Sequence, residues 1–197
     1  MRRIEAALRA VVTDLRELDR EFALLGGFAV SARAEPRTTR DVDLAVRVDD
    51  DADAELLAFE LARRGYAIRS TVEQIHTGRL ATIRTVAPSG AIVDLLFASS
   101  GIEPELVRAA TTIAILRDLE LPVATIGHLV ATKVLARDDQ RRPQDRIDLQ
   151  ALFRVASQAD LAEARQALDL MSDRGYARGR PLRAELDNAL AELGSRS

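Results

Sequence analysis

The sequence has 197 residues, 47% of them hydrophobic, and a formal net charge of −3. This length and composition predict a soluble globular protein with a sizeable core. The charge argues against a protein that coats nucleic acid, and the absence of any apolar run of about 18 residues argues against a membrane span. Acidic residues at helical spacing near the start predict an amphipathic helix instead of a secretory leader, so we expect a cytoplasmic protein.

The chain contains no cysteine and two histidines. Disulfides, zinc–thiolate sites, thiol nucleophiles and histidine-rich metal sites are therefore excluded. Any bound metal would need oxygen ligands, which favours a hard ion such as Mg²⁺.

Hydrophobic periodicity and turn residues predict the following elements in chain order. We expect a first half of mixed type, with helices over 3–19, 28–34 and 51–64 and strands over 21–26, 37–46, 66–70, 80–87 and 91–97, followed by a β-branched run over 111–124. The second half is helical, with patterns over 125–139, 144–156, 159–173 and 181–193. The predicted fold class is α+β, with a mixed-sheet core over 1–124 and a helical region over 125–197 packed on it.

Two carboxylates, Asp41 and Asp43, lie one residue apart in an otherwise apolar segment. In a strand, Arg37, Thr39, Asp41 and Asp43 share one face. Carboxylates about 5–7 Å apart on a partly buried sheet repel by a few kcal/mol at an effective dielectric near 20, so a cation or a proton is needed there. The same spacing recurs between 49 and 53, where a polar loop before a helix indicates helix caps in solvent.

A third acid, Asp94, lies within the apolar run AIVDLLF. If this strand pairs beside the first, three carboxylates meet at one edge of the sheet. That arrangement suits two Mg²⁺ ions that clamp the oxygens of a phosphoryl displacement. The alternative is a salt bridge between Asp94 and one of the many arginines.

The paired glycines Gly26 and Gly27 stand between a predicted strand and a predicted helix. Backbone N–H groups at such a helix N-terminus can bind a triphosphate. A plain tight turn is the alternative.

These residues, in this order, resemble the polymerase-β-like nucleotidyltransferase superfamily, whose motifs are a Gly-Gly or Gly-Ser turn, an Asp-x-Asp strand and a third strand carboxylate. The segment LVATKVLARDDQRRPQDRIDLQAL resembles the later motifs of AbiEii-type and MenT-type toxins of bacterial toxin–antitoxin systems, with a helix lysine, Lys133, followed by Asp145 and Asp148. The resemblance covers 22–155 and implies a nucleotidyltransferase fold. It places one of the two later aspartates in the active site without saying which.

Lys133 is the single lysine among 28 basic residues and lies beside the apolar stripe of its helix. A lone ammonium on an inward face favours a role in phosphate binding. A packed stem whose amine reaches solvent is the alternative. For Asp145 and Asp148, the alternatives are a helix cap and an ion pair with an arginine such as Arg146.

The resemblance implies a Mg²⁺-dependent enzyme in which Asp41 and Asp43 bind both metals, and Asp94 binds the metal near the attacking hydroxyl and helps to deprotonate it. Gly26, Gly27, Thr39, Arg40 and Lys133 form the implied nucleotide-binding set. In MenT-like toxins nucleotides, often pyrimidines, are added to the 3′ end of tRNA and translation stops. The resemblance therefore implies three partners: an NTP substrate, the 3′ end of a tRNA and a cognate antitoxin. Among the NTPs, it favours CTP or UTP.

Two further hypotheses concern RNA and regulation. The segment 174–183, RGYARGRPLR, has four arginines and a tyrosine that suit phosphate contacts and stacking on a single-stranded end, and Arg141, Arg142 and Arg146 form a second candidate patch. A phosphate on Thr39 would add negative charge beside the carboxylates, so a partner kinase or antitoxin could act there. A strand threonine chosen for β propensity is the alternative.

Two other functions fit the same motifs. The acceptor could be a small hydroxylated molecule, as in antibiotic nucleotidyltransferases. The chain could also be a catalytically inactive nucleotidyltransferase fold that acts as a binding or antitoxin module, although the presence of all three strand carboxylates and of Lys133 disfavours this.

Overall fold

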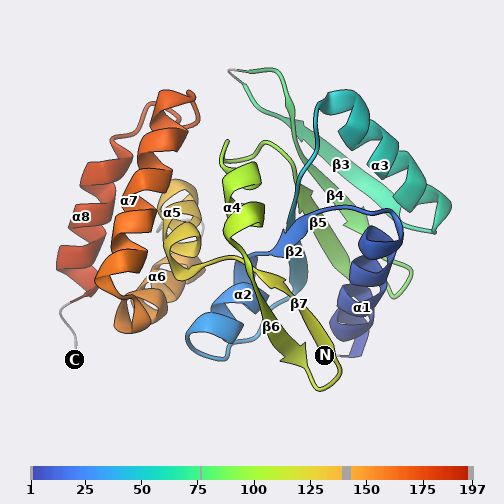
Figure 1. Ribbon diagram of the computed structural model, residues 1–197, viewed down its shortest axis with the longest axis horizontal. Helices are drawn as coiled ribbons and strands as arrows, with labels where there is room; N and C mark the ends of the chain where they lie inside the picture. The colour runs from blue at the N-terminus through green and yellow to red at the C-terminus, as the bar shows by residue number, and fades with distance from the viewer. Residues whose placement is uncertain (1, 76, 139–142, 195–197) are drawn as a thin grey trace.

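The computed structural model describes residues 2–75, 77–138 and 143–194. Its strands are β1 (Phe22–Leu24), β2 (Asp41–Val46), β3 (Ala67–Glu73), β4 (Leu80–Val86), β5 (Ile92–Leu96), β6 (Thr111–Leu116) and β7 (Leu119–Val123). Within the described residues they form one mixed sheet in the order β3-β4-β5-β2-β1-β7-β6 (Figure 1). Strand β2 thus lies near the middle, parallel to β5 and antiparallel to β1.

The helices of the described residues are α1 (Arg2–Glu17), α2 (Gly26–Arg33), α3 (Asp51–Arg63), α4 (Glu103–Ala109), α5 (Ile126–Ala136), α6 (Pro143–Val155), α7 (Gln158–Asp173) and α8 (Leu182–Leu193). Helices α5 to α8 gather on one side of the molecule, and α1 and α3 lie on the other (Figure 1). Helix α2 joins the sheet to the C-terminal helices, because it contacts β2 as well as α5 and α6. None of the helices in the described part of the chain is both long and apolar enough to cross a membrane.

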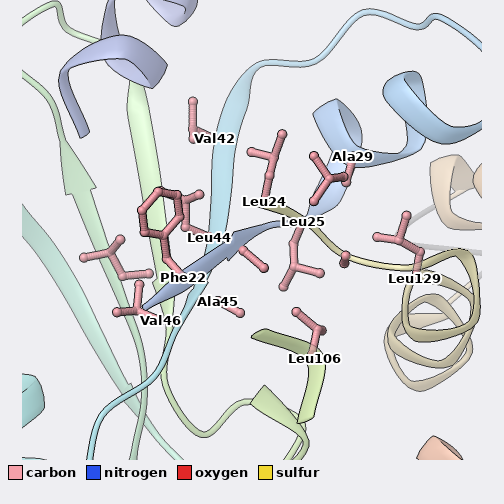
Figure 2. Close-up of a cluster of buried hydrophobic side chains, with 14 of the residues drawn as sticks. Phe22, Leu24, Leu25, Ala29, Val42, Leu44, Ala45, Val46, Leu106 and Leu129 are labelled. Carbon is pink, nitrogen blue, oxygen red and sulfur yellow. The ribbon is translucent and has the colours of Figure 1, made fainter. Parts of the chain in front are cut away.

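Side-chain alternation in β2 separates the core from the carboxylates. Val42 and Leu44 are fully buried, whereas Asp41 and Asp43 project from the opposite face and remain partly exposed. Figure 2 shows Val42 and Leu44 beside Phe22 and Leu24 of the neighbouring strand β1. A continuous apolar core therefore fixes the position of the strand that carries both acids.

Local sequence signals account for the ends of several helices. The Asp50 side chain accepts a hydrogen bond from the Asp53 backbone at the start of α3, and Ser157 and Asp160 form a capping box at the start of α7. Thr125 caps α5 by accepting from the His128 backbone N–H. The core continues into this helix through Leu129, which is fully buried.

The structure corrects two predictions for individual elements. The strand predicted over 37–46 begins only at Asp41, because Asp41 pairs with Ile92, the first residue of β5, and residues before it have no neighbouring strand. Helix α4 was not predicted, since its seven residues are too few to show a helical period. The β-branched run over 111–124 forms two antiparallel strands, β6 and β7. The other strands and helices lie where periodicity predicted them, within a few residues.

Candidate active site

The carboxylates of Asp41, Asp43 and Asp94 converge on one face of the sheet, on the neighbouring interior strands β2 and β5. In the parallel register of β2 and β5, Asp43 lies directly opposite Asp94. Each residue offers a carboxylate oxygen, and these oxygens lie within 4.8 Å of one another. Asp94 is buried and the other two are partly exposed, so the cluster opens to solvent on the side of Asp41 and Asp43.

Arg84 of β4 supplies positive charge to this cluster. It lies opposite Asp94 in the antiparallel β4–β5 register and donates from Nε and Nη2 to the two Asp94 oxygens, at 2.8 and 2.6 Å. These hydrogen bonds, together with the charges of Asp94, Asp41 and Asp43, raise the pKa of the Arg84 guanidinium. Both sequence interpretations of Asp94 therefore describe this residue, since it belongs to the carboxylate cluster and pairs with an arginine.

Gly26 and Gly27 bring the start of α2 against the carboxylates. Gly26 has φ +60°, and a Cβ at this position would lie 1.8 Å from Oδ2 of Asp43. A Cβ on Gly27 would lie 2.7 Å from both Nη2 of Arg37 and Oγ1 of Thr39. Only glycine allows the backbone to approach so closely, and Leu25 gives the helix no side-chain cap. The first N–H groups of α2 thus begin beside the acids.

The loop before β2 places Thr39 next to Asp41. The Thr39 hydroxyl lies 3.1 Å from the Asp41 carbonyl oxygen and 3.4 Å from Asp41 Oδ1. The predicted strand face that joined Arg37 to Asp41 is wrong, because these residues form a loop. Arg37 turns instead toward α6, where its Nε lies 2.7 Å from Oδ1 of Asp148 and its Nη2 donates to Oδ2 at 3.0 Å.

Lys133 and the two later aspartates form a buried network on the opposite wall. The Lys133 Nζ lies 2.7 Å from an oxygen of Asp145 and 2.7 Å from an oxygen of Asp148, and its side chain is only 11% exposed. Asp148 is shared between Lys133 and Arg37, so the alternative of an ion pair with an arginine is also found, with Arg37 as the partner in place of Arg146. Asp145 lines the cleft, and Asp148, whose side chain is fully buried, does not.

A cleft of about 710 Å³ lies between these two walls. It is lined by the three strand carboxylates and by the residues that face them, namely Gly26, Gly27, Arg37, Thr39, Arg40, Arg84, Lys133, Asp145 and Arg178. Arg40 is exposed at the mouth of the cleft. A cavity of this size suits a nucleotide-sized ligand.

The arginine-rich segment 174–183 differs from the prediction. Tyr176 is buried and packs against Gly101, so the proposed stacking of this ring on RNA is wrong. Arg174 pairs with Glu105 and Arg180 pairs with Glu185, and Arg178 lines the cleft. In the second candidate patch, Arg146 pairs with Glu192, and Arg141 and Arg142 lie outside the described residues.

The donor set of the carboxylate cluster fits a hard divalent cation. All the ligand atoms that it offers are carboxylate oxygens. Mg²⁺ is commonly bound through one or two carboxylates together with substrate phosphates, and the cleft beside the cluster leaves room for such a substrate.

Comparison with known proteins identifies the family. A family model described as "Nucleotidyl transferase AbiEii toxin, Type IV TA system" matches residues 7–196. The chain belongs to the AbiEii family. This match confirms the predicted resemblance to AbiEii toxins, and it makes the protein a nucleotidyltransferase of a toxin–antitoxin system, with a nucleotide substrate and an antitoxin counterpart. A search of curated protein sequences finds no match.

Solved structures support the fold. An antigenic nucleotidyltransferase-like protein from Paracoccidioides brasiliensis matches with a TM-score of 0.53 and 19% identity, over 95% of this chain and 92% of that one. The lincomycin-bound lincosamide antibiotic adenylyltransferase LnuA matches with a TM-score of 0.50 and 13% identity, over 77% of this chain and 98% of that one. At these identities the likeness shows the fold, and it confirms the predicted α+β nucleotidyltransferase class.

Sequence reasoning did not propose Arg37 and Arg84 as site residues. Arg84 interrupts a strand of threonines and apolar residues, and this lone charge is a usable signal because an acid at the paired position of a neighbouring strand would attract it. Arg37 gave a weaker signal, because its partner Asp148 lies 111 residues away in the sequence.

We predict that Gly26→Ala destabilises the protein by about 2–5 kcal/mol and abolishes nucleotide binding, because it adds left-handed backbone strain and a clash with Asp43. Gly90→Ala is the matched control, since Gly90 has φ +83° and a Cβ added there would have no atom within 4 Å. The control should lose only about 1–2 kcal/mol. Urea unfolding measures the free energy of unfolding of both variants. Equal losses of stability would contradict the close approach of Gly26 to Asp43.

We predict that Arg84→Gln lowers the Tm in EDTA by about 2–4 °C for each kcal/mol of lost charge compensation, since the three carboxylates then repel without a neighbouring guanidinium. Mg²⁺ should raise the Tm of the variant more than that of the wild type, because a cation bound at the cluster replaces the missing charge. Thermal unfolding with and without Mg²⁺ tests this, with Arg47→Gln as a control on an exposed pair with Glu21. An identical Mg²⁺ response in wild type and Arg84→Gln would reject the prediction.

Proposed function

We propose that this chain transfers nucleotides, CMP or UMP being favoured, from an NTP to the 3′ end of tRNA and thereby blocks translation. Pyrophosphate is the second product. The observation that carries the proposal is the cleft in which a three-carboxylate cluster faces a glycine-rich helix N-terminus and a buried lysine. Family membership supports nucleotide transfer, and the tRNA acceptor and the pyrimidine preference are the finer parts of the proposal.

In this proposal Asp41 and Asp43 would hold both Mg²⁺ ions, and Asp94 would hold the ion on the acceptor side. When bound, Mg²⁺ supplies charge neutralisation for the triphosphate and acidifies the attacking hydroxyl. Asp94 accepts the proton of that hydroxyl or orients it, while Arg84 holds the Asp94 carboxylate through two hydrogen bonds.

The triphosphate binds in the cleft between the start of α2 and Lys133. The backbone N–H groups of Gly26 and Gly27 face the cleft at the start of α2, where the helix dipole favours an anion. Lys133 uses two of its three N–H donors for Asp145 and Asp148, which leaves the third to be directed at a phosphate. Thr39 and Arg40 line the cleft and complete the nucleotide-binding set.

The two later aspartates have different tasks in this proposal. Asp145 borders the cleft and is the acid that belongs to the active site. Asp148, whose side chain is fully buried, positions Lys133 and Arg37 without touching substrate. We also propose that 1–124 and 125–197 are distinct regions, the first carrying the metal-binding acids and the second carrying the lysine that binds phosphate.

The direct test is transfer from each of four radiolabelled NTPs, supplied one at a time, to purified tRNA in the presence of Mg²⁺. We expect labelled tRNA with CTP or UTP, and a loss of at least about 1,000-fold in Asp41→Asn, since one carboxylate is then removed from the metal cluster. The control Asp49→Asn changes an exposed acid outside the cleft and should retain activity.

The same assay includes the competing acceptors. Labelled lincosamide or aminoglycoside in place of labelled tRNA would replace the proposal with small-molecule transfer. No transfer to any acceptor, together with an unchanged cellular phenotype of Asp41→Asn, would instead assign the chain to the inactive binding modules.

We further propose that Thr39 is a control point for the antitoxin, for example a kinase. Its hydroxyl lies beside Asp41 and above Gly27. A phosphate there adds about −1.5 to −2 charge where a triphosphate must bind. Thr39→Glu should therefore lower transfer by about 100-fold or more, while Thr39→Val, which removes the hydroxyl without adding charge, should stay within about tenfold of wild type. Initial rates of the transfer assay measure both, and normal activity of Thr39→Glu would reject the proposal.

A further inference from the structure

The loop between α7 and α8 has an unusual backbone. Three of its residues have positive φ, namely Gly175 at +82°, Arg178 at +55° and Gly179 at +71°. Glycine adopts this conformation without steric cost, but an arginine does not. Among the described non-glycine residues, Asp19 is the other one with positive φ. Arg178 therefore occupies a position for which glycine or asparagine would be the ordinary choice.

Residues on both sides of Arg178 anchor the loop to the rest of the cleft. Arg174 donates to the Glu105 carboxylate and to the Gly101 carbonyl oxygen, and the Tyr176 ring packs on Gly101. These contacts fix one end of the loop against the start of α4, at the upper end of α7 and α8 in Figure 1. The residues on the N-terminal side of Arg178 are thus held in place.

Arg180 fixes the other end. Its guanidinium donates to the carbonyl oxygens of Val134 and Leu135 at the end of α5, at 3.1 and 2.7 Å, and pairs with Glu185. Because α5 also carries Lys133, the loop is fixed to the helix that supplies the buried ammonium. The strained residue between these anchors is the one that lines the cleft.

We propose that Arg178 is a substrate-binding residue that contacts a phosphate group of the substrate at the mouth of the cleft. A planar guanidinium matches phosphate oxygens in a bidentate arrangement, and backbone strain that is maintained by anchored neighbours is typical of functional positions. Arg178 lines the same cavity as Ser99 and Ser100, which follow the Asp94 strand, and as Lys133. The inference deepens the proposed function and rests on it.

Two sources of this phosphate fit the chemistry, the polyphosphate of the NTP and the backbone of a nucleic acid acceptor. Binding measurements distinguish them. In an Asp41→Asn background, which prevents turnover, the Kd values of inorganic tripolyphosphate, CTP and tRNA are measured with and without Arg178→Gly. Weaker binding of tripolyphosphate and CTP assigns the contact to the nucleotide, and weaker binding of tRNA alone assigns it to the acceptor. Either result supports the proposal.

We expect the affected Kd to rise about tenfold or more, which is the effect of losing one charge-assisted contact. The Tm of Arg178→Gly should be unchanged or higher, because glycine relieves the positive-φ strain. Arg178→Asn, which tolerates the same backbone, should behave alike. Arg117→Gly is the charge-matched control, since it removes an exposed arginine from the turn between β6 and β7 and should leave all three Kd values unchanged.

Two results would overturn the proposal. One is wild-type affinity of both Arg178 variants for all three probes. The other is a fall in Tm of more than about 4 °C in both variants, which would assign Arg178 a structural role. Because the readouts are binding and stability, failure of the transfer assay leaves them interpretable, so failure of the proposed function and failure of this inference are distinguishable.

Discussion

The site depends on the concentration of negative charge on one face of the sheet. Three carboxylates whose oxygens lie within 4.8 Å repel by about 3 kcal/mol per pair at an effective dielectric near 20. The fold keeps Asp94 in place with the two hydrogen bonds from Arg84, and the fully buried Val42 and Leu44 on the other face hold the neighbouring strand. The apolar core thus offsets a repulsion that the polar face creates.

The charged groups around Lys133 balance one another in a second network. Lys133 and Arg37 carry two positive charges, and Asp145 and Asp148 balance them in a network with little exposure. A buried charge network of this kind contributes little net stability, but it fixes the direction in which each group points. The ammonium is therefore oriented before any phosphate arrives, which reduces the ordering cost of binding.

Local pattern was sufficient for the parts of the site that lie within single strands. Alternation placed Asp41 and Asp43 on one face, and the second acidic strand suggested the cluster with Asp94. The sequence pattern did not predict the structure at positions where contacts between residues distant in the sequence determine it. The residues before Asp41 form a loop because no strand pairs with them. Arg84 contacts Asp94 only because the β4–β5 register places the two residues opposite each other. Tyr176 is buried because Gly101 leaves room for its ring.

The contact between Arg37 and Asp148 has a consequence for synthesis of the protein. These residues lie 111 positions apart, so a growing chain that has left the ribosome only as far as β7 already contains the three clustered strand carboxylates but lacks Lys133, Asp145 and Asp148. Such an intermediate lacks the side chains that α5 and α6 contribute to the cleft. A cell that makes this toxin therefore gains an interval during translation in which the unfinished chain cannot assemble a complete cleft.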